Sequence, residues 1–170
     1  MPRQDNTVLL EDVRIIFRNF QGREGMYNRK GDRNFAVLLP KDVADAMARD
    51  GWNVKLLKAR EEGEEDQPYI SVTVGFKGRP PTIKVISDTT GRTTELDEEG
   101  VDILDWVDIA QVDLIIRPYD WEVSGNTGRK AYLQSLYMTI IEDPLQVKYA
   151  DIATVEGPMM ERTEVLNPND

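Results

Sequence analysis

Two long alternating runs near the end of the chain constrain its fold most strongly. Residues 112–123 read VDLIIRPYDWEV, residues 129–141 read RKAYLQSLYMTII, and SGNTG separates them. β-Branched and aromatic residues dominate both runs, and Asn with Gly in the short connection is typical of a hairpin turn. The two runs therefore predict a long antiparallel hairpin, with a five-residue connection at 124–128.

The rest of the chain consists of short β-type runs with few helical patterns. Further strands are predicted at 7–20, 34–40, 52–60, 69–76 and 81–87. We expect the last two to form a second hairpin, joined by KGRP. Short helices are predicted at 40–51, where Pro40 suits the first turn and Gly51 the C-terminal cap, and at 96–106. This pattern favours a mainly β fold, either a small barrel or a sandwich.

Cysteine and histidine are both absent from the 170 residues. Disulfides, thiolate chemistry and the commonest ligands of zinc are therefore excluded. Asp102 and Asp105 lie three residues apart on the predicted acidic helix, but no lysine–carboxylate arrangement typical of a metal-dependent nuclease accompanies them. No phosphate-binding loop motif occurs either. We expect a protein that is not an enzyme and that needs no cofactor or metal.

The sequence also argues against a membrane protein. No apolar run approaches the roughly 18 residues of a membrane-spanning helix. The first residues, MPRQDN, do not resemble a signal peptide. We therefore expect a soluble cytoplasmic protein with no membrane partner.

The formal net charge of -10 hides a strong asymmetry. Between Val13 and Arg33 there are six basic residues and two acidic ones. Acid dominates elsewhere, with five carboxylates in 61–66, seven in 95–108, and seven against two basic residues from Glu142 onward. A basic groove on an acidic body can still bind a polyanion, because the local potential controls binding.

Residues 18–35, RNFQGREGMYNRKGDRNF, interleave cations with aromatic rings. Single-stranded nucleic acid is bound by this mixture, since cations follow the phosphates while rings stack on unpaired bases. The alternative is a solvated loop in which Phe20 and Phe35 are buried at the ends of strands. A third basic run lies at 52–60, where Lys55 either contacts the nucleic acid or faces solvent.

The final hairpin is the second candidate surface. Arg117, Tyr119 and Trp121 alternate onto one face of the first strand, and Lys130 with Tyr132 share a face of the second. Ile115 and Val123 lie on that same face of the first strand, and Leu136 with Met138 continue the parity of the second as core. Cross-strand packing is therefore an open alternative to base stacking.

Three segments together resemble a known family. NRKGDRNFAVLL, DGWNVK and DLIIRPYDWEVSGNTGRKAYLQSLYMTIIED are similar to bacteriophage single-stranded DNA-binding proteins of the Enc34-like OB-fold family, common in phages of Actinobacteria. The resemblance runs from Val8 to Tyr149. It implies an OB-type barrel that binds single strands with little sequence preference, in replication, recombination or protection of exposed DNA. The chain ends in EVLNPND and lacks the terminal aromatic with which many such proteins recruit replication partners.

Taken together, the residues and the resemblance predict a mainly β, OB-fold-like small barrel over 1–149 and a flexible acidic tail over 150–170. The predicted partner is single-stranded DNA in an infected bacterial cell, with replication or recombination proteins on the tail. A homodimer or a cooperative assembly on DNA is left open. The alternative function is an acidic protein-interaction module, a phage component or host-factor antagonist that binds no nucleic acid. The predicted DNA-binding residues are Arg14, Arg18, Phe20, Arg23, Tyr27, Arg29, Lys30, Arg33, Phe35, Lys55, Arg117, Tyr119, Trp121, Arg129, Lys130 and Tyr132.

Overall fold

The computed structural model describes residues 6–26, 28–143, 145 and 148. The predicted tail at 150–170 and the candidate Tyr27 lie outside the described residues. The strands of the described part are β1 (Val8–Leu10), β2 (Ile15–Asn19), β3 (Arg33–Leu38), β4 (Val54–Leu57), β5 (Gln67–Val74), β6 (Thr82–Ser87), β7 (Thr93–Leu96), β8 (Ile109–Val123) and β9 (Asn126–Ile140). Its helices are α1 (Lys41–Arg49) and the short 3-10 helix η1 (Val101–Asp105).

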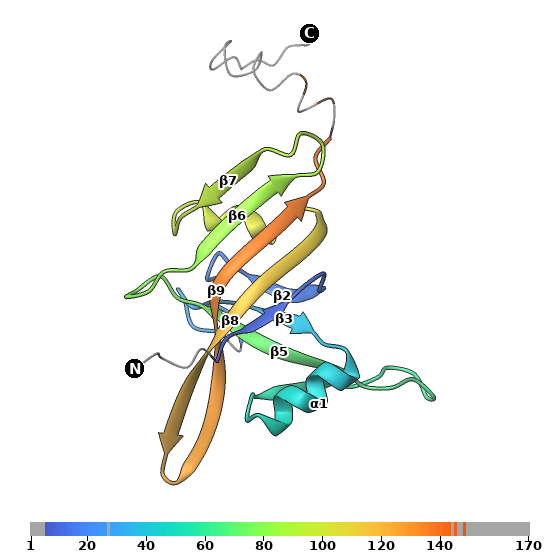
Figure 1. Cartoon of the computed structure of the whole chain (residues 1–170), viewed down its shortest axis with the longest axis vertical. Helices are drawn as coiled ribbons and strands as arrows, with labels where there is room; N and C mark the ends of the chain where they lie inside the picture. The colour runs from blue at the N-terminus through green and yellow to red at the C-terminus, as the bar shows by residue number, and fades with distance from the viewer. Residues whose placement is uncertain (1–5, 27, 144, 146–147, 149–170) are drawn as a thin grey trace.

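The β8–β9 hairpin runs through the whole molecule (Figure 1), and the other strands are arranged around it. The sheet order is β1-β8-β9-β5-β3-β2, with β4 on β5 and the β6–β7 pair on β9. Among the described residues no ladder joins β1 to β2, so the sheet is not closed by hydrogen bonds. β1 and β2 are the two ends of this order, yet only residues 11–14 separate them along the chain. The two edges of the sheet must therefore lie close together, and the sheet curls around a core.

The single long strand predicted at 7–20 is wrong, because the chain turns in the middle of it. Asp12 has a positive φ of 52°, and its backbone N–H donates to the Asp113 carboxylate at 2.7 Å. β1 pairs with β8 before this turn, whereas β2 pairs with β3 after it. The chain therefore crosses at this turn from the β8 side of the core to the β3 side.

The hairpin predicted between residues 69–76 and 81–87 is also wrong. β5 and β6 do not pair with each other but both run parallel to β9. β5 already has antiparallel partners in β3 and β4, so β6 continues along β9 instead and pairs with a strand, β7, that the sequence pattern did not predict. The acidic helix predicted at 96–106 is reduced to one 3-10 segment, η1.

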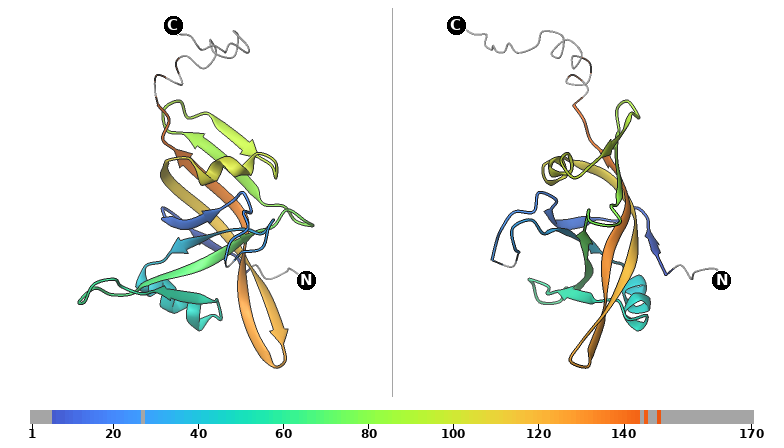
Figure 2. Two further views of the ribbon diagram at one scale, coloured as in Figure 1. Left: turned by 180° about the vertical axis from the view of Figure 1, so that it is seen from behind. Right: turned by 90° about the vertical axis from the view of Figure 1, so that its left-hand side faces the viewer.

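One core lies between these elements. Its largest fully buried side chains come from β3, β5, β6, β8, β9, η1 and the residues directly after β2 and β3. They include Phe20, Phe35, Leu39, Ile70, Ile83, Leu104, Leu114, Ile116, Leu133, Leu136 and Met138. η1 and α1 lie at different ends of the β8–β9 hairpin (Figure 2). α1 begins after Pro40, buries Ala44 and Met47, and is followed by Gly51 at a φ of 94°, where a residue without Cβ is favoured.

A register shift in the β8–β9 hairpin decides which side chains of β9 are buried. Ile116 pairs with Leu133 and Ile115 with Ser135, which leaves Gln134 as an extra residue in β9. The buried side chains of β9 are Ala131 and Leu133 before the shift and Leu136, Met138 and Ile140 after it. Lys130 and Tyr132 were expected on the same face of β9 as the core residues Leu136 and Met138, and this expectation is wrong. Lys130 and Tyr132 lie on the face opposite to buried Ala131 and Leu133.

Candidate nucleic-acid interface

The free end of the β8–β9 hairpin projects from the body as an arm (Figure 1). Val123 pairs with Asn126, so the turn consists of Ser124 and Gly125 alone, and both have positive φ, 51° and 83°. Two-residue turns with this backbone match the twist of the flanking strands. The predicted five-residue connection is therefore too long, and Gly128 belongs to β9 instead.

Gly128 makes room for Trp121 on the arm. The two residues are direct cross-strand partners. A Cβ atom at Gly128 would lie 2.5 Å from a carbon of the Trp121 ring, far inside van der Waals contact. The indole therefore covers the glycine, and Trp121 stays 39 % exposed. The absence of a side chain at Gly128 therefore leaves the space in which the Trp121 ring packs against the arm.

One face of the arm carries aromatic rings paired with cations. Because opposite residues in an antiparallel pair share a face, Tyr119 faces Lys130 and Arg117 faces Tyr132. The Tyr119 and Tyr132 ring centroids lie 5.7 Å apart. The Arg117 guanidinium and the Lys130 ammonium lie 5.7 and 5.6 Å from the centroid of the Tyr132 ring. We call Arg117, Tyr119, Trp121, Lys130 and Tyr132 the arm face.

The outer side of β5 continues the arm face. Thr73 lies beside Tyr132 in the parallel register, while Val72 beside Ala131 is buried. Side chains alternate along a strand, so Tyr69 shares the outward side of Thr73 and Ile70 points to the core. At ~3.3 Å per residue, Tyr69 lies roughly 13 Å along the strand from Thr73.

A second aromatic pair lies at that end of β5. The Phe17 ring meets the Tyr69 ring edge-on, with centroids 6.0 Å apart and planes at 77°. Phe17 is 59 % exposed and has a φ of 55°, which is rare for a bulky residue, and it sits in a register shift between Ile16 and Asn19. Lys55 on β4 pairs with Tyr69 and is exposed. We call Phe17, Lys55, Tyr69 and Thr73 the outer β5 face.

Sequence reasoning missed Phe17 and Tyr69 as candidate residues. The alternation of YISVTV already placed Tyr69 opposite Ile70 and Val72, so its outward direction was readable from the sequence. Nothing local indicates the register shift that turns Phe17 outward.

Phe20 and Phe35, both predicted to stack on bases, are buried instead. They are 0 % and 1 % exposed, and their rings stack on each other with centroids 5.1 Å apart and planes at 22°. Neither ring has a face left for a base. The alternative that placed them in the core at the ends of strands is therefore correct.

Two arginines of the basic segment hold the fold together. The Arg18 Nη1 donates to the carbonyl oxygens of Leu104 and Val107, both at 2.9 Å, and so ties η1 to β2. The Arg33 guanidinium forms an ion pair with Glu98 at 3.2 Å and lies 5.6 Å from the Phe76 ring, with 18 % of its side chain exposed. The local excess of positive charge is therefore only partly available to a ligand.

The remaining cations of this segment are exposed. Arg29 forms a 3.5 Å ion pair with Asp32, although 92 % of its side chain is open to solvent. Arg14, Arg23 and Lys30 are exposed, and none of them has a carboxylate within 4.0 Å in the part of the chain that the structure describes. Their role in binding stays a prediction.

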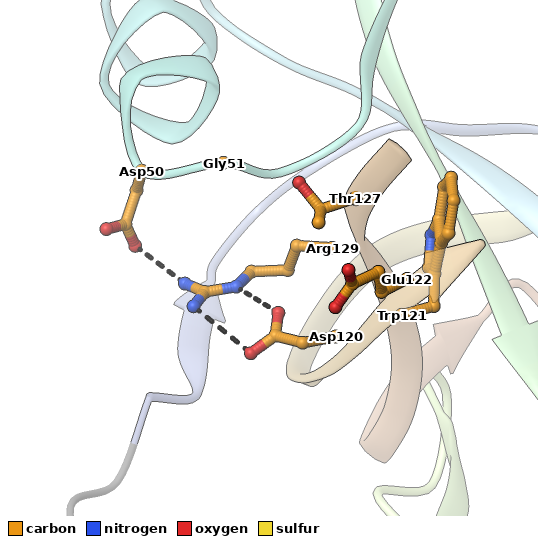
Figure 3. Close-up of a pocket in the computed structure, with 8 residues that line it drawn as sticks. Asp50, Gly51, Asp120, Trp121, Glu122, Thr127 and Arg129 are labelled. Atoms are coloured by element: carbon orange, nitrogen blue, oxygen red, sulfur yellow. Dashed lines mark hydrogen bonds and ion pairs between the residues drawn. The ribbon is translucent and has the colours of Figure 1, made fainter. Parts of the chain in front are cut away.

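Arg129 lies on the opposite side of the arm from the arm face (Figure 3). It forms ion pairs with Asp120 at 2.8 Å and with Asp50 at 3.3 Å, and its guanidinium lies 5.6 Å from the Trp52 ring. The hydrogen bond that Arg129 donates to the Asp120 carboxylate raises the pKa of Arg129 above its ordinary value. The ion pair with Asp50 joins the arm to the end of α1. Because two carboxylates already neutralise Arg129, it is poorly placed to bind a phosphate.

Arg117 has the opposite electrostatic setting. Burial lowers the pKa of Arg117, and the charge of Arg79 lowers it further. The Arg117 Nη2 also donates to the Arg79 carbonyl oxygen at 3.4 Å. No carboxylate lies within 4.0 Å of either guanidinium among the described residues. An anion placed between the two cations would relieve their repulsion. Arg79 is therefore a candidate phosphate-binding residue that the sequence did not suggest.

The described residues contain no group of three or more carboxylates that could hold a metal ion. Within the same residues, no helix is both long and apolar enough to span a membrane.

Comparisons with known proteins bear on the fold and the family of the chain. A family model described as "Putative phage ssDNA-binding domain" matches residues 2–169. The chain is similar to the single-stranded DNA-binding protein from bacteriophage Enc34 in complex with ssDNA, with a TM-score of 0.51 and 15% sequence identity over 81% of this chain and 88% of that one. This likeness confirms the predicted OB-fold-like, mainly β class.

Two further solved structures are less similar. A second structure of the Enc34 protein gives a TM-score of 0.49 at 16% identity over 86% of this chain and 89% of that one. The single-stranded DNA-binding protein gp2.5 of bacteriophage T7 gives 0.38 at 10% identity over 96% and 100%. A search of curated proteins gave no match. Because the family model spans residues 2–169, the chain belongs to the family of phage single-stranded DNA-binding domains.

Proposed function

We propose that the chain binds single-stranded DNA, without reading its sequence, across the outer β5 face and the arm face. The observation that carries this proposal is a pair of aromatic clusters on the outer side of neighbouring strands, Phe17 with Tyr69 and Tyr119 with Tyr132. In each cluster the first ring is exposed and the second is half-buried. Membership of the phage single-stranded DNA-binding family supports it.

The chemistry of these two faces fits an unpaired strand. A base can stack on a ring only after it has left the duplex, and each stacked base contributes about 1–3 kcal/mol whatever its identity. Lys55, Lys130 and Arg117 lie beside the rings, where they would replace counterions on the phosphates. Rings and cations read no base edges, so sequence preference should be weak.

The biological role that we infer is protection of exposed strands in phage DNA replication and recombination, in the cytoplasm of the infected host. No catalytic step is part of this proposal. The binding unit would be residues 1–149. The acidic segment 150–170 would serve as a docking tail for replication or recombination proteins, and pairing or cooperative assembly of copies on DNA is compatible with this arrangement.

The proposal is tested by fluorescence anisotropy of the full chain with labelled oligo-dT at two salt concentrations, with a duplex of mixed sequence as the control. We expect binding to the single strand that weakens steeply with salt, since log K falls by about 0.7 per neutralised phosphate for each tenfold rise in salt. The duplex should bind more weakly. Absence of binding at low salt, or binding that ignores salt, would overturn the proposal and favour an acidic module that binds proteins.

A further inference from the structure

Trp106 is a large exposed side chain that belongs to neither the arm face nor the outer β5 face. It directly follows η1 and is 65 % exposed. Ile103, on the same short helix, is 46 % exposed. Tryptophan is enriched at interfaces, where its ring combines an apolar body with a polar N–H, so this indole is a candidate contact.

The position of Trp106 is fixed by contacts on both sides of it. Arg18 donates to the carbonyl oxygens of Leu104 and Val107, which flank the indole in sequence, both at 2.9 Å. The Asp105 carboxylate accepts the backbone N–H groups of Phe20 at 2.7 Å and Gln21 at 3.0 Å. η1 and the start of the loop at 20–32 are therefore one connected unit, and the indole is held at the base of that loop.

A cation from the same loop lies over the indole. The Arg23 guanidinium is 5.7 Å from the centroid of the Trp106 ring. The Asn28 side chain holds the loop in shape, since its amide donates to the carbonyl oxygens of Arg23, Arg29 and Asp32 at 2.8 to 3.0 Å. A ring with an adjacent cation on an ordered support repeats the arrangement of Tyr132 with Lys130.

Two of the carboxylates in this part of the molecule are engaged. Asp105 is bound by two backbone N–H groups, and Glu98 is paired with Arg33. Exposed Arg23 and Lys30 then leave the loop attractive to an anion. Glu24, which follows Arg23, and Asp108 are exposed and have no ion pair among the described residues, so the site should be weaker than the arm face.

The site also lies close to the outer β5 face. Arg18 directly follows Phe17 in β2, and its side chain reaches the two carbonyl groups beside Trp106. Phe17 of the outer β5 face and the arginine that anchors the support of Trp106 are therefore consecutive residues of β2.

We propose that Trp106 and Arg23 form a third stacking site for single-stranded DNA, which only oligonucleotides longer than the outer β5 face and arm face can reach. This inference rests on the proposed function. Short strands should fill the two faces first, because they offer more rings and more cations. Longer strands should then place a base on the indole.

Intrinsic fluorescence can report this site in the full chain. Trp121→Phe leaves exposed Trp106 together with Trp52, which is 4 % exposed. The double variant Trp121→Phe, Trp106→Phe retains Trp52 alone and gives the background emission. Labelled oligo-dT of increasing length is titrated, with anisotropy reporting binding and tryptophan emission reporting stacking.

We expect short oligonucleotides to bind without changing the Trp106 emission and longer ones to quench it. In the same series Trp106→Ala should weaken the affinity for long oligonucleotides by roughly 5- to 150-fold, the range for one stacked base. The affinity for short oligonucleotides should not change. Arg23→Ala should act in the same direction with a smaller effect. Ile103→Ala is the matched control on the same helix and should change neither readout.

The outcomes separate the two proposals. If no oligonucleotide of any length binds, the proposed function itself fails and this inference fails with it. If oligonucleotides bind but the Trp106 emission never changes and Trp106→Ala binds every length as the parent does, this inference alone is overturned. Equal weakening of short and long oligonucleotides by Trp106→Ala, with Trp106→Phe restoring neither, would also overturn it, because that result indicates a structural role.

Discussion

The segment 18–35 and the arm contain the same mixture of cations and aromatic residues, yet the fold uses them in opposite ways. In the segment, Phe20 and Phe35 stack on each other in the core. On the arm, Tyr119 and Trp121 stay exposed, and two cations lie within 5.7 Å of the centroid of the Tyr132 ring. This difference shows that backbone register, rather than local composition, decides which aromatic rings are accessible to a ligand.

The cations of the two regions differ in the same sense. Arg33 is paired with Glu98 and Arg18 with backbone carbonyl groups, so their hydrogen-bonding capacity serves the fold. Arg117 instead lies near Arg79, and repulsion between the two favours an anion. Arg117 also donates to the carbonyl oxygens of Leu133 and Arg79, so it differs from Arg18 in the second cation beside it and not in lacking a protein acceptor.

The comparison is tested most strongly by removing a buried ring. Phe20→Ala should lower the free energy of unfolding by about 3–5 kcal/mol, as expected for a large buried aromatic side chain. Chemical denaturation measures this change. At temperatures where the variant is folded, its affinity for oligo-dT should equal that of the parent. A stable variant with lost affinity would show that Phe20 contacts DNA and that the comparison is wrong.

Removing an outward ring should have the reverse effect. Tyr132→Ala should weaken binding of oligo-dT by about 1–3 kcal/mol, because the ring stacks on a base. Tyr69→Ala should act similarly at the other end of β5. Anisotropy titration measures the affinity, and thermal unfolding is the control. If these variants unfold but bind normally when folded, the tyrosines are packing residues only.

Gly128→Ala tests the support of the arm face. The added Cβ would meet the Trp121 ring at 2.5 Å, so the indole must move. We expect a shift in tryptophan emission and a loss of affinity no larger than that of Trp121→Ala, about 1–3 kcal/mol at most. Thr127→Ala, the neighbouring exposed position, is the matched control. Parent-like emission and affinity would contradict the assigned position of Trp121.

The smallest expected effect separates the cations by salt dependence. Lys130→Ala should reduce the slope of log K against log salt by about 0.7, the value for one phosphate contact on a single strand. Arg18→Ala should leave the slope unchanged and instead lower the free energy of unfolding by about 1.5–3 kcal/mol, since charged hydrogen bonds are lost. Identical slope changes in both variants would remove the distinction between the two regions.

Part of this arrangement follows directly from the sequence. The alternation in 112–123 and 129–141 predicted the β8–β9 hairpin, and the shared parity of Arg117, Tyr119 and Trp121 predicted their common face. These features depend on neighbours along one strand or across one short turn. The pairing of Arg117 with Tyr132 and of Tyr119 with Lys130 depends on the two-residue turn, which the predicted five-residue connection did not give.

Other parts depend on contacts that no local pattern encodes. The extra residue Gln134 resets the parity of β9, and the shift beside Phe17 turns that ring outward. The parallel pairing of β5 and β6 with β9 joins segments far apart in sequence. The contacts that occupy Arg18, Arg33 and Arg129 likewise come from η1, the segment after β7 and the end of α1. A charge count therefore overestimated the free cations of 14–33.

The central claim is that single strands lie on the outer β5 face and the arm face, and photo-crosslinking tests it most directly. The full chain is bound to oligo-dT that carries 5-iododeoxyuridine, irradiated, digested, and mapped by mass spectrometry. We predict crosslinks at Tyr69, Tyr119, Trp121 and Tyr132, all suppressed by unlabelled single strands. Crosslinks confined to residues outside these two faces, with the four aromatic residues unmodified, would contradict the claim.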